Sequence, residues 1–183
     1  RNEFIKDIKN EIININFLVN SLLKLSKLDS NSVNFIFENE YINTIISKSI
    51  KNVSVLCDLK NIDIVVDGDT NVKINCDVKW QIEAITNIIK NCVEHSNSNS
   101  KIYINFDENE LYTKLQIKDN GVGIDKKDLP HIFERFYKGK NSSNESVGIG
   151  LALSKSIIEK SNADIRVNSK INEGTNFTIK YYK

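Results

Sequence analysis

Two closely spaced glycine pairs constrain the fold of this chain more than any other feature of its sequence. Residues 119–124 read DNGVGI and residues 148–153 read GIGLAL, in a chain with only seven glycines. Glycine costs backbone entropy wherever its conformational freedom is not used. We therefore expect both pairs to form turns in which the backbone closely approaches a neighbouring segment or a ligand.

Length and charge narrow the class of protein. With 183 residues, of which 40% are apolar, the chain has the size of one soluble domain with an appended segment. Its net charge of +1 gives no long-range positive field, so we expect no nucleic-acid partner. No apolar run approaches the ~18 residues of a membrane span and no signal-peptide pattern is present, so we expect no direct membrane contact.

The ends and the cysteines add two expectations. The chain begins at Arg1 and contains no methionine, and we therefore expect a fragment whose targeting or membrane segments lie elsewhere in a longer protein. Cys57, Cys76 and Cys92 are odd in number and widely spaced, which is typical of reduced, cytosolic core residues.

An amphipathic pattern opens the chain. Apolar residues alternate at spacings of three and four, which predicts a helix with a coiled-coil seam. The seam consists of Ile5, Ile8, Ile12, Ile15, Val19 and Leu22. Such a helix could pack on its own domain, but a seam this regular favours a bundle with other chains or with missing segments. The turn-forming residues 28–32 end it.

The remaining sequence predicts an α+β fold. Period-two segments predict strands at 33–38, 62–66, 72–76, 101–107, 111–118, 163–169 and 175–182. Helical periodicity covers 40–57, 78–96 with Asp77 as N-cap, a short piece near 126–132, and Gly148 to about Ser161. We expect a two-layer α/β sandwich, with a mixed sheet of about five strands covered by three helices and preceded by the long amphipathic helix.

Neither glycine pair fits two familiar phosphate-binding motifs. The P-loop pattern is absent, since GKN at 139–141 lacks both the hydroxyl residue and the upstream glycine. The third glycine of the dinucleotide-binding motif is replaced by Lys126 in the first pair and by Leu153 in the second.

The aspartate of DNGVGI suits recognition of a base. Asp119 ends a predicted strand, so its carboxylate is expected at the rim of the sheet. An ionised carboxylate accepts hydrogen bonds only, which fits the exocyclic amine of adenine and disfavours the keto oxygen of guanine. The alternative is an Asx-turn, which Asp-Asn-Gly forms readily, and Asp119 alone favours that alternative.

GIGLAL opens a predicted helix. Glycines there let backbone N–H groups approach an anion at the positive end of the helix dipole, which is a phosphate site. A close helix–strand contact explains the glycines equally well.

Two asparagines provide a third element. Asn87 and Asn91 are four residues apart and share one face of the helix before the hairpin. An amide oxygen is a competent Mg²⁺ ligand, and Mg²⁺ usually takes few protein ligands together with phosphates and waters. Solvent-facing asparagines in an Asn-rich chain are the alternative, and the spacing alone favours it.

In this order, five segments resemble the ATP-binding domain of sensor histidine kinases. Its asparagine, first glycine, phenylalanine, second glycine and third glycine boxes are similar to NIIKNCVEHS (87–96), DNGVGI (119–124), HIFERFY (131–137), GIGLAL (148–153) and EGTNF (173–177). The resemblance implies that residues 32–183 are a catalytic ATP-binding domain. Residues 1–31 resemble the second helix of that family's dimerisation and phosphotransfer hairpin, which explains the seam.

The resemblance implies roles for matching residues. Asn91 would bind Mg²⁺ with support from Asn87, and Asp119 would bind the adenine amine in a pocket shaped by Gly123 and Thr175. The remaining expected nucleotide contacts are His95, Gly121, Ile124, Gly148, Ile149, Gly150 and Leu151. Residues 138–146 resemble the mobile ATP lid, with Phe133 and Phe136 as apolar contacts and Arg135 or, more favourably, Lys138 reaching phosphate oxygens.

Three activities compete. Related gyrases, chaperones and mismatch-repair ATPases carry a glutamate base one turn before the Mg²⁺ asparagine, whereas this chain has Asn87, whose amide cannot take a proton from water. The resemblance therefore implies phosphoryl transfer to a histidine. A hydrolase of the same superfamily and a nucleotide-binding pseudokinase acting through dimer contacts are the alternatives.

The acceptor histidine of the family has no counterpart here. Its H-E-x-x-[TN]-P-like box is absent, and His95 and His131 lie in other boxes, so we expect no catalytic residue in the chain and no autophosphorylation of this fragment alone. The family further implies a homodimer through the N-terminal helix, a response-regulator receiver domain as partner, and a membrane-anchored full-length protein facing the cytoplasm.

Overall fold

The computed structural model describes residues 2–139 and 148–183. Over these ranges the chain forms, in order, α1 (Asn2–Asp29), β1 (Glu38–Tyr41), α2 (Ile42–Lys60), β2 (Asp63–Gly68), β3 (Lys73–Cys76), α3 (Val78–His95), β4 (Lys101–Glu108), β5 (Tyr112–Lys118), the 3₁₀ turn η1 (Leu129–His131), α4 (Gly150–Lys160), β6 (Ala163–Lys170) and β7 (Gly174–Tyr182).

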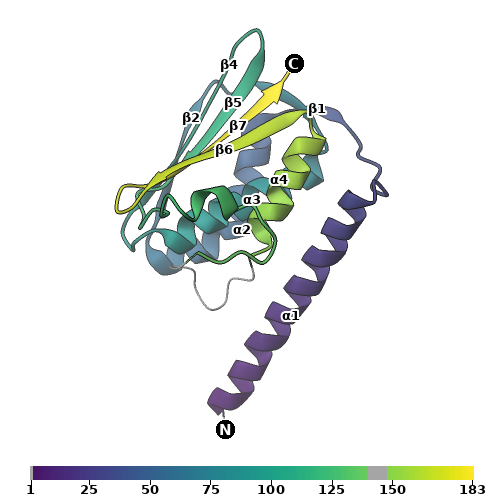
Figure 1. The fold of residues 1–183 in the computed structure, drawn as a ribbon. Helices are drawn as coiled ribbons and strands as arrows, with labels where there is room; N and C mark the ends of the chain where they lie inside the picture. The colour runs from purple at the N-terminus through teal and green to yellow at the C-terminus, as the bar shows by residue number, and fades with distance from the viewer. Residues whose placement is uncertain (1, 140–147) are drawn as a thin grey trace.

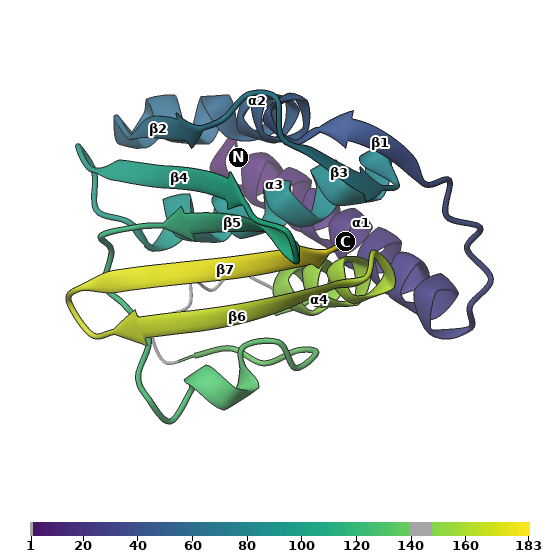
Figure 2. The ribbon, with the colours of Figure 1, turned by 90° about the horizontal axis from the view of Figure 1, so that it is seen from above.

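Five of the described strands form one mixed sheet in the order β2-β4-β5-β7-β6. β2 pairs in parallel with β4, and the other neighbours are antiparallel. Every second residue of β4, β5 and β7 is buried along most of each strand, because helices α2, α3 and α4 cover one face of the sheet (Figures 1 and 2). The predicted two-layer α+β sandwich is confirmed.

The core lies between the sheet and α3. Phe177 of β7 is fully buried and lies between Ile117 and Val167 of its neighbouring strands. Ile85 and Ile89 of α3 are also fully buried. Helical periodicity thus places one face of α3 in the core and leaves another face free for polar side chains.

Asp77 caps α3 as predicted. Its Oδ1 accepts hydrogen bonds from the backbone N–H groups of Lys79 (3.1 Å) and Trp80 (3.2 Å). Its Oδ2 accepts a third hydrogen bond, of 2.9 Å, from the backbone of Ile36. One carboxylate therefore both starts α3 and fixes the segment that connects α1 to the sandwich.

The strand predicted at 33–38 is wrong for most of its length. Residues 33–37 are irregular, since Phe35 packs against Trp80 with ring centroids 5.8 Å apart instead of joining a sheet. The short β1 follows and pairs with β3 in a separate two-stranded sheet. Alternating apolar residues here reflect packing on a helix and not a ladder of backbone hydrogen bonds.

Two predicted helices are shorter than expected. The helix near 126–132 is reduced to the 3₁₀ turn η1. The last helix begins at Gly150, two residues after the predicted start, because Gly148 has a left-handed backbone with φ of +71°. The Gly148 carbonyl instead accepts a hydrogen bond of 2.9 Å from the N–H of Phe136.

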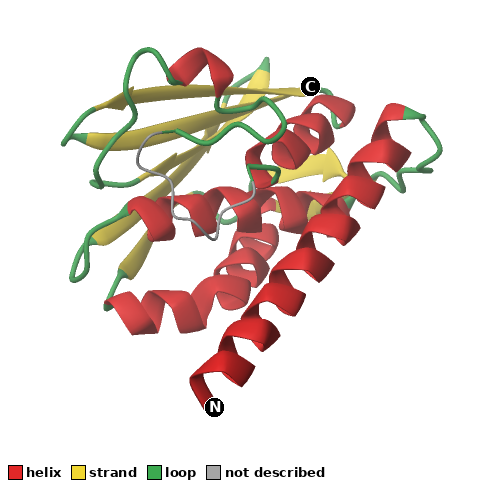
Figure 3. Ribbon diagram, turned by 60° about the horizontal axis from the view of Figure 1, so that its bottom comes forward, coloured by secondary structure: helices red, strands yellow, loops and turns green. Residues whose placement is uncertain are grey.

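Most of α1 extends away from the sandwich (Figures 1 and 3). All six residues of the predicted seam are exposed, whereas Leu25 and Leu28 near its end are buried against the other helices. The sequence left two alternatives for this helix, packing on its own domain or in a bundle with other segments. Packing on its own domain is limited to the end of α1 that carries Leu25 and Leu28. Among the described residues, no helix is both long and apolar enough to cross a membrane.

The three cysteines are free thiols in the core, as predicted from their number and spacing. Burial, with neighbouring acidic groups as a smaller cause, raises the pKa of the Cys76 thiol to about 12. Burial likewise raises the pKa of Cys92 well above its usual value. Both thiols therefore stay protonated at neutral pH.

Candidate functional site

One face of α3 brings the sequence motifs together. Asn87, Asn91 and His95 are half-buried and follow one another at intervals of four residues. A Cβ atom added to Gly150 would lie 3.8 Å from the Asn87 side chain, and one added to Gly121 would lie 2.3 Å from the His95 carbonyl oxygen. The two glycine turns therefore meet the same helix face, the second turn at Asn87 and the first turn at His95.

The amides of Asn87 and Asn91 are available to a ligand. Neither side chain makes a hydrogen bond to another residue that the structure describes. Half-buried amides usually have a partner, because a buried polar group without one costs free energy. The fit of these residues to a polar ligand or a hydrated cation is therefore good.

Asp119 lies at the end of β5 next to this face, and it is buried, with 2% of its surface exposed. Its Oδ1 accepts hydrogen bonds from the backbone N–H groups of Gly121 (2.8 Å) and Thr175 (3.1 Å). The Cys92 thiol also bonds to the carboxyl group. The Asx-turn considered from the sequence is thus present, and it fixes the carboxylate in one orientation. Asp119 directly follows β5 and so lies at the end of that strand, as expected, but the group is buried instead of open to solvent.

The environment of Asp119 affects its charge in two directions. Burial raises the pKa of this carboxyl group. The hydrogen bonds from Gly121, Cys92 and Thr175 and the nearby charge of His95 act in the opposite direction and are smaller. The hydrogen bonds therefore offset only part of the cost of burying the ionised carboxylate.

The turn between β6 and β7 supports the first glycine pair. Ser169 Oγ accepts a hydrogen bond of 2.8 Å from the Ile124 N–H and lies 2.9 Å from Thr175 Oγ1. The Asn172 N–H donates to the Val122 carbonyl at 2.8 Å. Sequence analysis missed Ser169 and also Cys92, which it assigned only to the core. Ser169 lies opposite Thr175 in the β6–β7 register, and that register is the signal that could have revealed it.

The second glycine pair forms the start of α4. Ile149 is buried, whereas Gly148, Gly150 and Leu151 are half-buried and lie at the edge of the α3 face. The first N–H groups of any helix have no partner within that helix, and they carry a partial positive charge. Ser154 Oγ donates to the Ala84 carbonyl at 3.0 Å, which holds α4 against α3.

The two residues predicted to reach phosphate oxygens, Arg135 and Lys138, differ in their contacts. Arg135 forms an ion pair with Asp29 of α1, and Lys138 is exposed. Phe133 packs on the core, with the Lys155 Nζ 5.6 Å from its ring centroid, whereas Phe136 is exposed. Their role as apolar contacts of the lid stays a prediction. Of the predicted lid 138–146, residues 140–146 lie outside the described residues.

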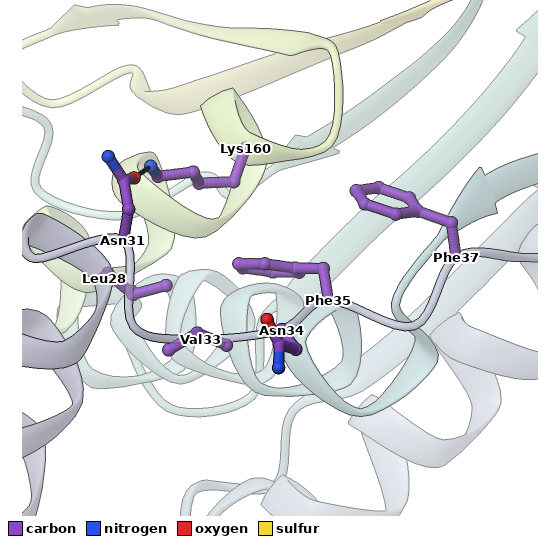
Figure 4. A pocket seen from close by; sticks show the side chains of 7 residues that line it. All are labelled: Leu28, Asn31, Val33, Asn34, Phe35, Phe37 and Lys160. Carbon is purple, nitrogen blue, oxygen red and sulfur yellow. Dashed lines mark hydrogen bonds between the residues drawn. The ribbon is translucent and has the colours of Figure 1, made fainter.

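A separate cleft of about 360 Å³ lies where the end of α1 meets the end of α4 (Figure 4). It is lined by Leu28, Asn31, Val33, Asn34, Phe35, Phe37 and Lys160. None of the residues predicted to bind nucleotide lines it. Within residues 2–139 and 148–183, no three His, Cys, Asp or Glu side chains gather as a metal site.

Comparison with known proteins decides the family. Residues 76–182 match the family described as histidine kinase-, DNA gyrase B-, and HSP90-like ATPase. This match spans more than half of the chain and includes α3 and both glycine turns. The chain belongs to this family. The heme sensor protein HssS of Staphylococcus haemolyticus strain JCSC1435 is 33% identical over 180 residues, which cover 98% of this chain and 39% of the relative.

Solved structures of histidine kinases share the fold of this ATPase. Acinetobacter baumannii AdeS has a TM-score of 0.83 at 22% identity, covering 100% of this chain and 85% of that chain. Full-length ShkA in complex with AMPPNP has a TM-score of 0.84 at 16% identity, covering 100% of this chain and 39% of that chain. ThkA in complex with the response regulator TrrA has a TM-score of 0.79 at 20% identity, covering 99% and 51%. At these identities the likeness shows the fold alone.

The resemblance stated from the five sequence motifs is therefore confirmed. The chain carries an ATPase domain of this family, and it is similar to HssS along nearly all of its own length. It spans well under half of the length of HssS.

Proposed function

We propose that this ATPase domain binds Mg-ATP along the Asn87–His95 face of α3 and transfers the γ-phosphoryl group to a histidine outside these residues. The observation that carries the proposal is the position of that face between two glycine turns. Gly121 meets it beside the buried Asp119, and Gly150 meets it at the start of α4. One end thus offers a fixed hydrogen-bond acceptor, and the other offers unpaired backbone N–H groups.

The adenine ring would occupy the Asp119 end. The carboxylate accepts a hydrogen bond from the exocyclic amine, and Gly121, Gly123, Ile124 and Thr175 form the surrounding turns. Guanine has a keto oxygen at that position, and bringing it against a buried carboxylate would leave two acceptors facing each other. The proposal therefore includes a preference for adenine.

The phosphates would occupy the α4 end. The residues from Gly148 to Leu151 present N–H groups at the positive end of the helix dipole, which favours anions. Lys138 is exposed and carries the charge that could reach phosphate oxygens. His95 lies on the same face of α3 as Asn87 and Asn91, and its charge partly offsets the rise that burial causes in the pKa of the nearby Asp119 carboxyl group.

Asn91 would be the protein ligand of Mg²⁺, and Asn87 would support the phosphates and the metal-bound waters. The free amides of these two side chains fit this role, since Mg²⁺ keeps several waters and takes few protein oxygens. When bound, the ion neutralises charge on the phosphates during transfer. The protein's own contribution is to position the nucleotide.

The residues around Asn87 favour transfer over hydrolysis. An amide cannot accept a proton from water, so position 87 provides no general base. Glu83 lies one turn earlier, but its carboxylate forms an ion pair of 2.6 Å with Lys24 of α1. The γ-phosphoryl group is therefore kept for a stronger nucleophile, which in this family is an imidazole.

The exposed seam of α1 supports the partner proposal. The six side chains of the predicted seam of α1 are exposed, and a second copy of the helix with its hairpin partner would cover them. We assign residues 1–31 to the second helix of a dimerisation and phosphotransfer hairpin and residues 32–183 to the catalytic domain. A receiver domain would take the phosphoryl group from the histidine, and the full-length protein would be anchored in the cell membrane with these residues in the cytoplasm.

A transfer assay in trans tests the function. The chain is mixed with Mg²⁺, γ-labelled ATP and a separate hairpin polypeptide that bears the family's histidine. We expect acid-labile label on the hairpin with the wild-type chain and little with Asn91→Ala. The control is Asn105→Ala, because Asn105 is exposed on β4, and it should label like wild type. No label on the hairpin with a folded wild-type chain would refute the transfer, and sustained release of phosphate without it would favour the hydrolase.

A further inference from the structure

An ion pair connects α1 to the turn that precedes the second glycine pair. One guanidinium nitrogen of Arg135, Nη2, lies 2.7 Å from both carboxylate oxygens of Asp29. Asp29 is the last residue of α1, and Arg135 lies four residues beyond η1. Both side chains are nearly half-exposed, so the ion pair alone makes a small contribution to stability. Its importance depends on what its two ends are attached to.

The α1 end of the ion pair has a firm support. Leu25 and Leu28, on the last turns of α1, are each only 1% exposed. Lys24 forms the ion pair with Glu83 of α3, and Lys160 of α4 donates a hydrogen bond to Asn31 (Figure 4). Asp29 is therefore held in place by contacts that do not include Arg135.

The other end of the ion pair belongs to a strained turn. Phe136 has a φ of +64°, a left-handed conformation that is unfavourable for a bulky L-residue. Its side chain is 57% exposed, so its own packing does not hold that conformation. The residues on either side are held instead, Arg135 by Asp29 and Tyr137 by a hydrogen bond of 2.7 Å from its hydroxyl to Asp128.

The strained residue contacts the second glycine turn directly. The Phe136 N–H donates to the Gly148 carbonyl at 2.9 Å. A Cβ atom on Gly148 would also lie 2.4 Å from the Tyr137 carbonyl oxygen, so the two segments touch along their backbones. Any change in the Phe136 conformation is therefore transmitted to the start of α4.

We propose that Asp29 is a positioning residue for the second glycine turn. Through Arg135 it holds Phe136 in the left-handed conformation, and the Phe136–Gly148 hydrogen bond then fixes the backbone that leads into α4. The position of α1 and the geometry of this turn are thereby coupled. If the second glycine turn binds phosphates, as in the proposed function, the same coupling links α1 to phosphate binding. Only this last step rests on the proposed function. By linkage, phosphate binding would then affect the position of α1 by the same free energy.

Amide hydrogen exchange of the nucleotide-free 183-residue chain tests the coupling directly. Asp29→Asn removes the charge but keeps the size, and we expect the Phe136 amide to exchange about three- to tenfold faster than in the wild-type chain. Glu83→Gln is the matched control, because it breaks the Lys24–Glu83 ion pair of α1 without touching the turn, and it should leave this amide within about twofold. An unprotected Phe136 amide in the wild-type chain, or equal protection in Asp29→Asn, would overturn the proposal.

Two further variants separate positioning from a general loss of structure. The exchanged pair Asp29→Arg with Arg135→Asp should restore most of the protection. In a Phe136→Asn background, Asp29→Asn should have little effect on the amide of residue 136, because asparagine tolerates the left-handed conformation. An undiminished effect in that background would show that relief of backbone strain is not the cause.

Calorimetric titration with Mg-ATP tests the last step. We expect Asp29→Asn to weaken nucleotide binding about two- to fivefold and Glu83→Gln to leave it unchanged. If the wild-type chain binds no nucleotide, the proposed function fails, and the exchange result still decides the coupling. If it binds and Asp29→Asn binds equally well, the link between α1 and the phosphates is refuted.

Discussion

The two ends of the α3 face are built differently. At the Asp119 end, the carboxylate is buried and bonded to the backbone of Gly121 and Thr175. At the α4 end, Gly150 and Leu151 are half-buried, and a Cβ atom added to Gly150 would lie 3.8 Å from the Asn87 side chain, an ordinary contact distance. At the Asp119 end, the carboxylate is already hydrogen-bonded without a ligand. At the start of α4, the first N–H groups would take their hydrogen-bond acceptors from a ligand. On the proposed function, the fold would thus fix the base more rigidly than the phosphates.

The largest expected effect is at Gly123. Its φ is +71°, and a Cβ atom there would lie 2.0 Å from the Lys170 carbonyl oxygen, a backbone atom that cannot move freely. Gly123→Ala should therefore lower the free energy of unfolding by roughly 3 kcal/mol or more and abolish nucleotide binding. Urea denaturation measures the loss. A wild-type midpoint for Gly123→Ala would show that this end is less rigid than the structure indicates.

Asp119→Asn separates binding from stability. The asparagine Oδ1 can still accept from Gly121 and Thr175, but the charge that the proposed function uses to select adenine is lost. We expect ATP binding to weaken by roughly 1.5–3 kcal/mol, which is about 10- to 100-fold, with no decrease in stability. Calorimetry tests the weaker ATP binding, and thermal denaturation tests the prediction that stability does not decrease. An unfolded variant would contradict the prediction on stability.

The same variant has a pH dependence that follows from burial. Because folding raises the pKa of Asp119, the folded state binds this proton more tightly than the unfolded chain does. The ionised carboxylate therefore costs stability in full above the folded pKa; the cost decreases as the pH falls from the folded pKa toward the unfolded pKa, and it is absent below the unfolded pKa. The stability of Asp119→Asn relative to wild type should be highest near pH 7 and should fall as the pH is lowered through that pKa. Denaturation at several pH values measures the trend, and the opposite slope would contradict it.

An intermediate effect is expected at Lys60, which bonds to the carboxyl end of α3 next to the Asp119 end of the site. Its Nζ donates to the backbone carbonyls of Val93, Glu94 and Ser96 at 2.7–3.1 Å, and so caps the carboxyl end of α3. Lys60→Met should lower the free energy of unfolding by about 1–2 kcal/mol. Lys60→Arg keeps the charge and should recover part of the loss. Equal stability of Lys60→Met and wild type would exclude a role for this cap.

The smallest effect is expected at Gly150. An added methyl group would lie 3.8 Å from Asn87, an ordinary contact, and alanine favours a helix. Gly150→Ala should change the free energy of unfolding by less than about 0.5 kcal/mol. Denaturation of this variant beside Gly123→Ala compares the two ends directly. A loss as large as that of Gly123→Ala would remove the difference between them.

Local patterns in the sequence account for much of this fold. The period of α3, its Asp77 cap and the β4–β5 hairpin depend on residues close together in the chain, and the structure has them where they were expected. Segment 33–37 shows the limit of such patterns. Its alternation of apolar residues suggested a strand, but no neighbouring strand pairs with it, and Phe35 packs on a helix instead.

Long-range pairing explains what the sequence did not reveal. The parallel pairing of β2 with β4 and the β1–β3 sheet depend on which strands meet in space. The role of Ser169 depends on its register against Thr175, and Asp29 finds Arg135 across 106 residues of sequence. The spacing of Asn87 and Asn91 placed them on one helix face but did not by itself favour a ligand site, and only the fold places Gly150 beside Asn87.

A titration of the isotopically labelled chain with Mg-ATP, followed by amide NMR, tests the central claim most directly. We predict the largest shifts at two groups of signals. One group is the backbone of Asp119, Gly121 and Thr175, and the other is the Asn91 side chain with the backbone from Gly148 to Leu151. Shifts confined to the cleft between Leu28 and Lys160, or no shifts at millimolar Mg-ATP, would contradict the assignment of the α3 face as the nucleotide site.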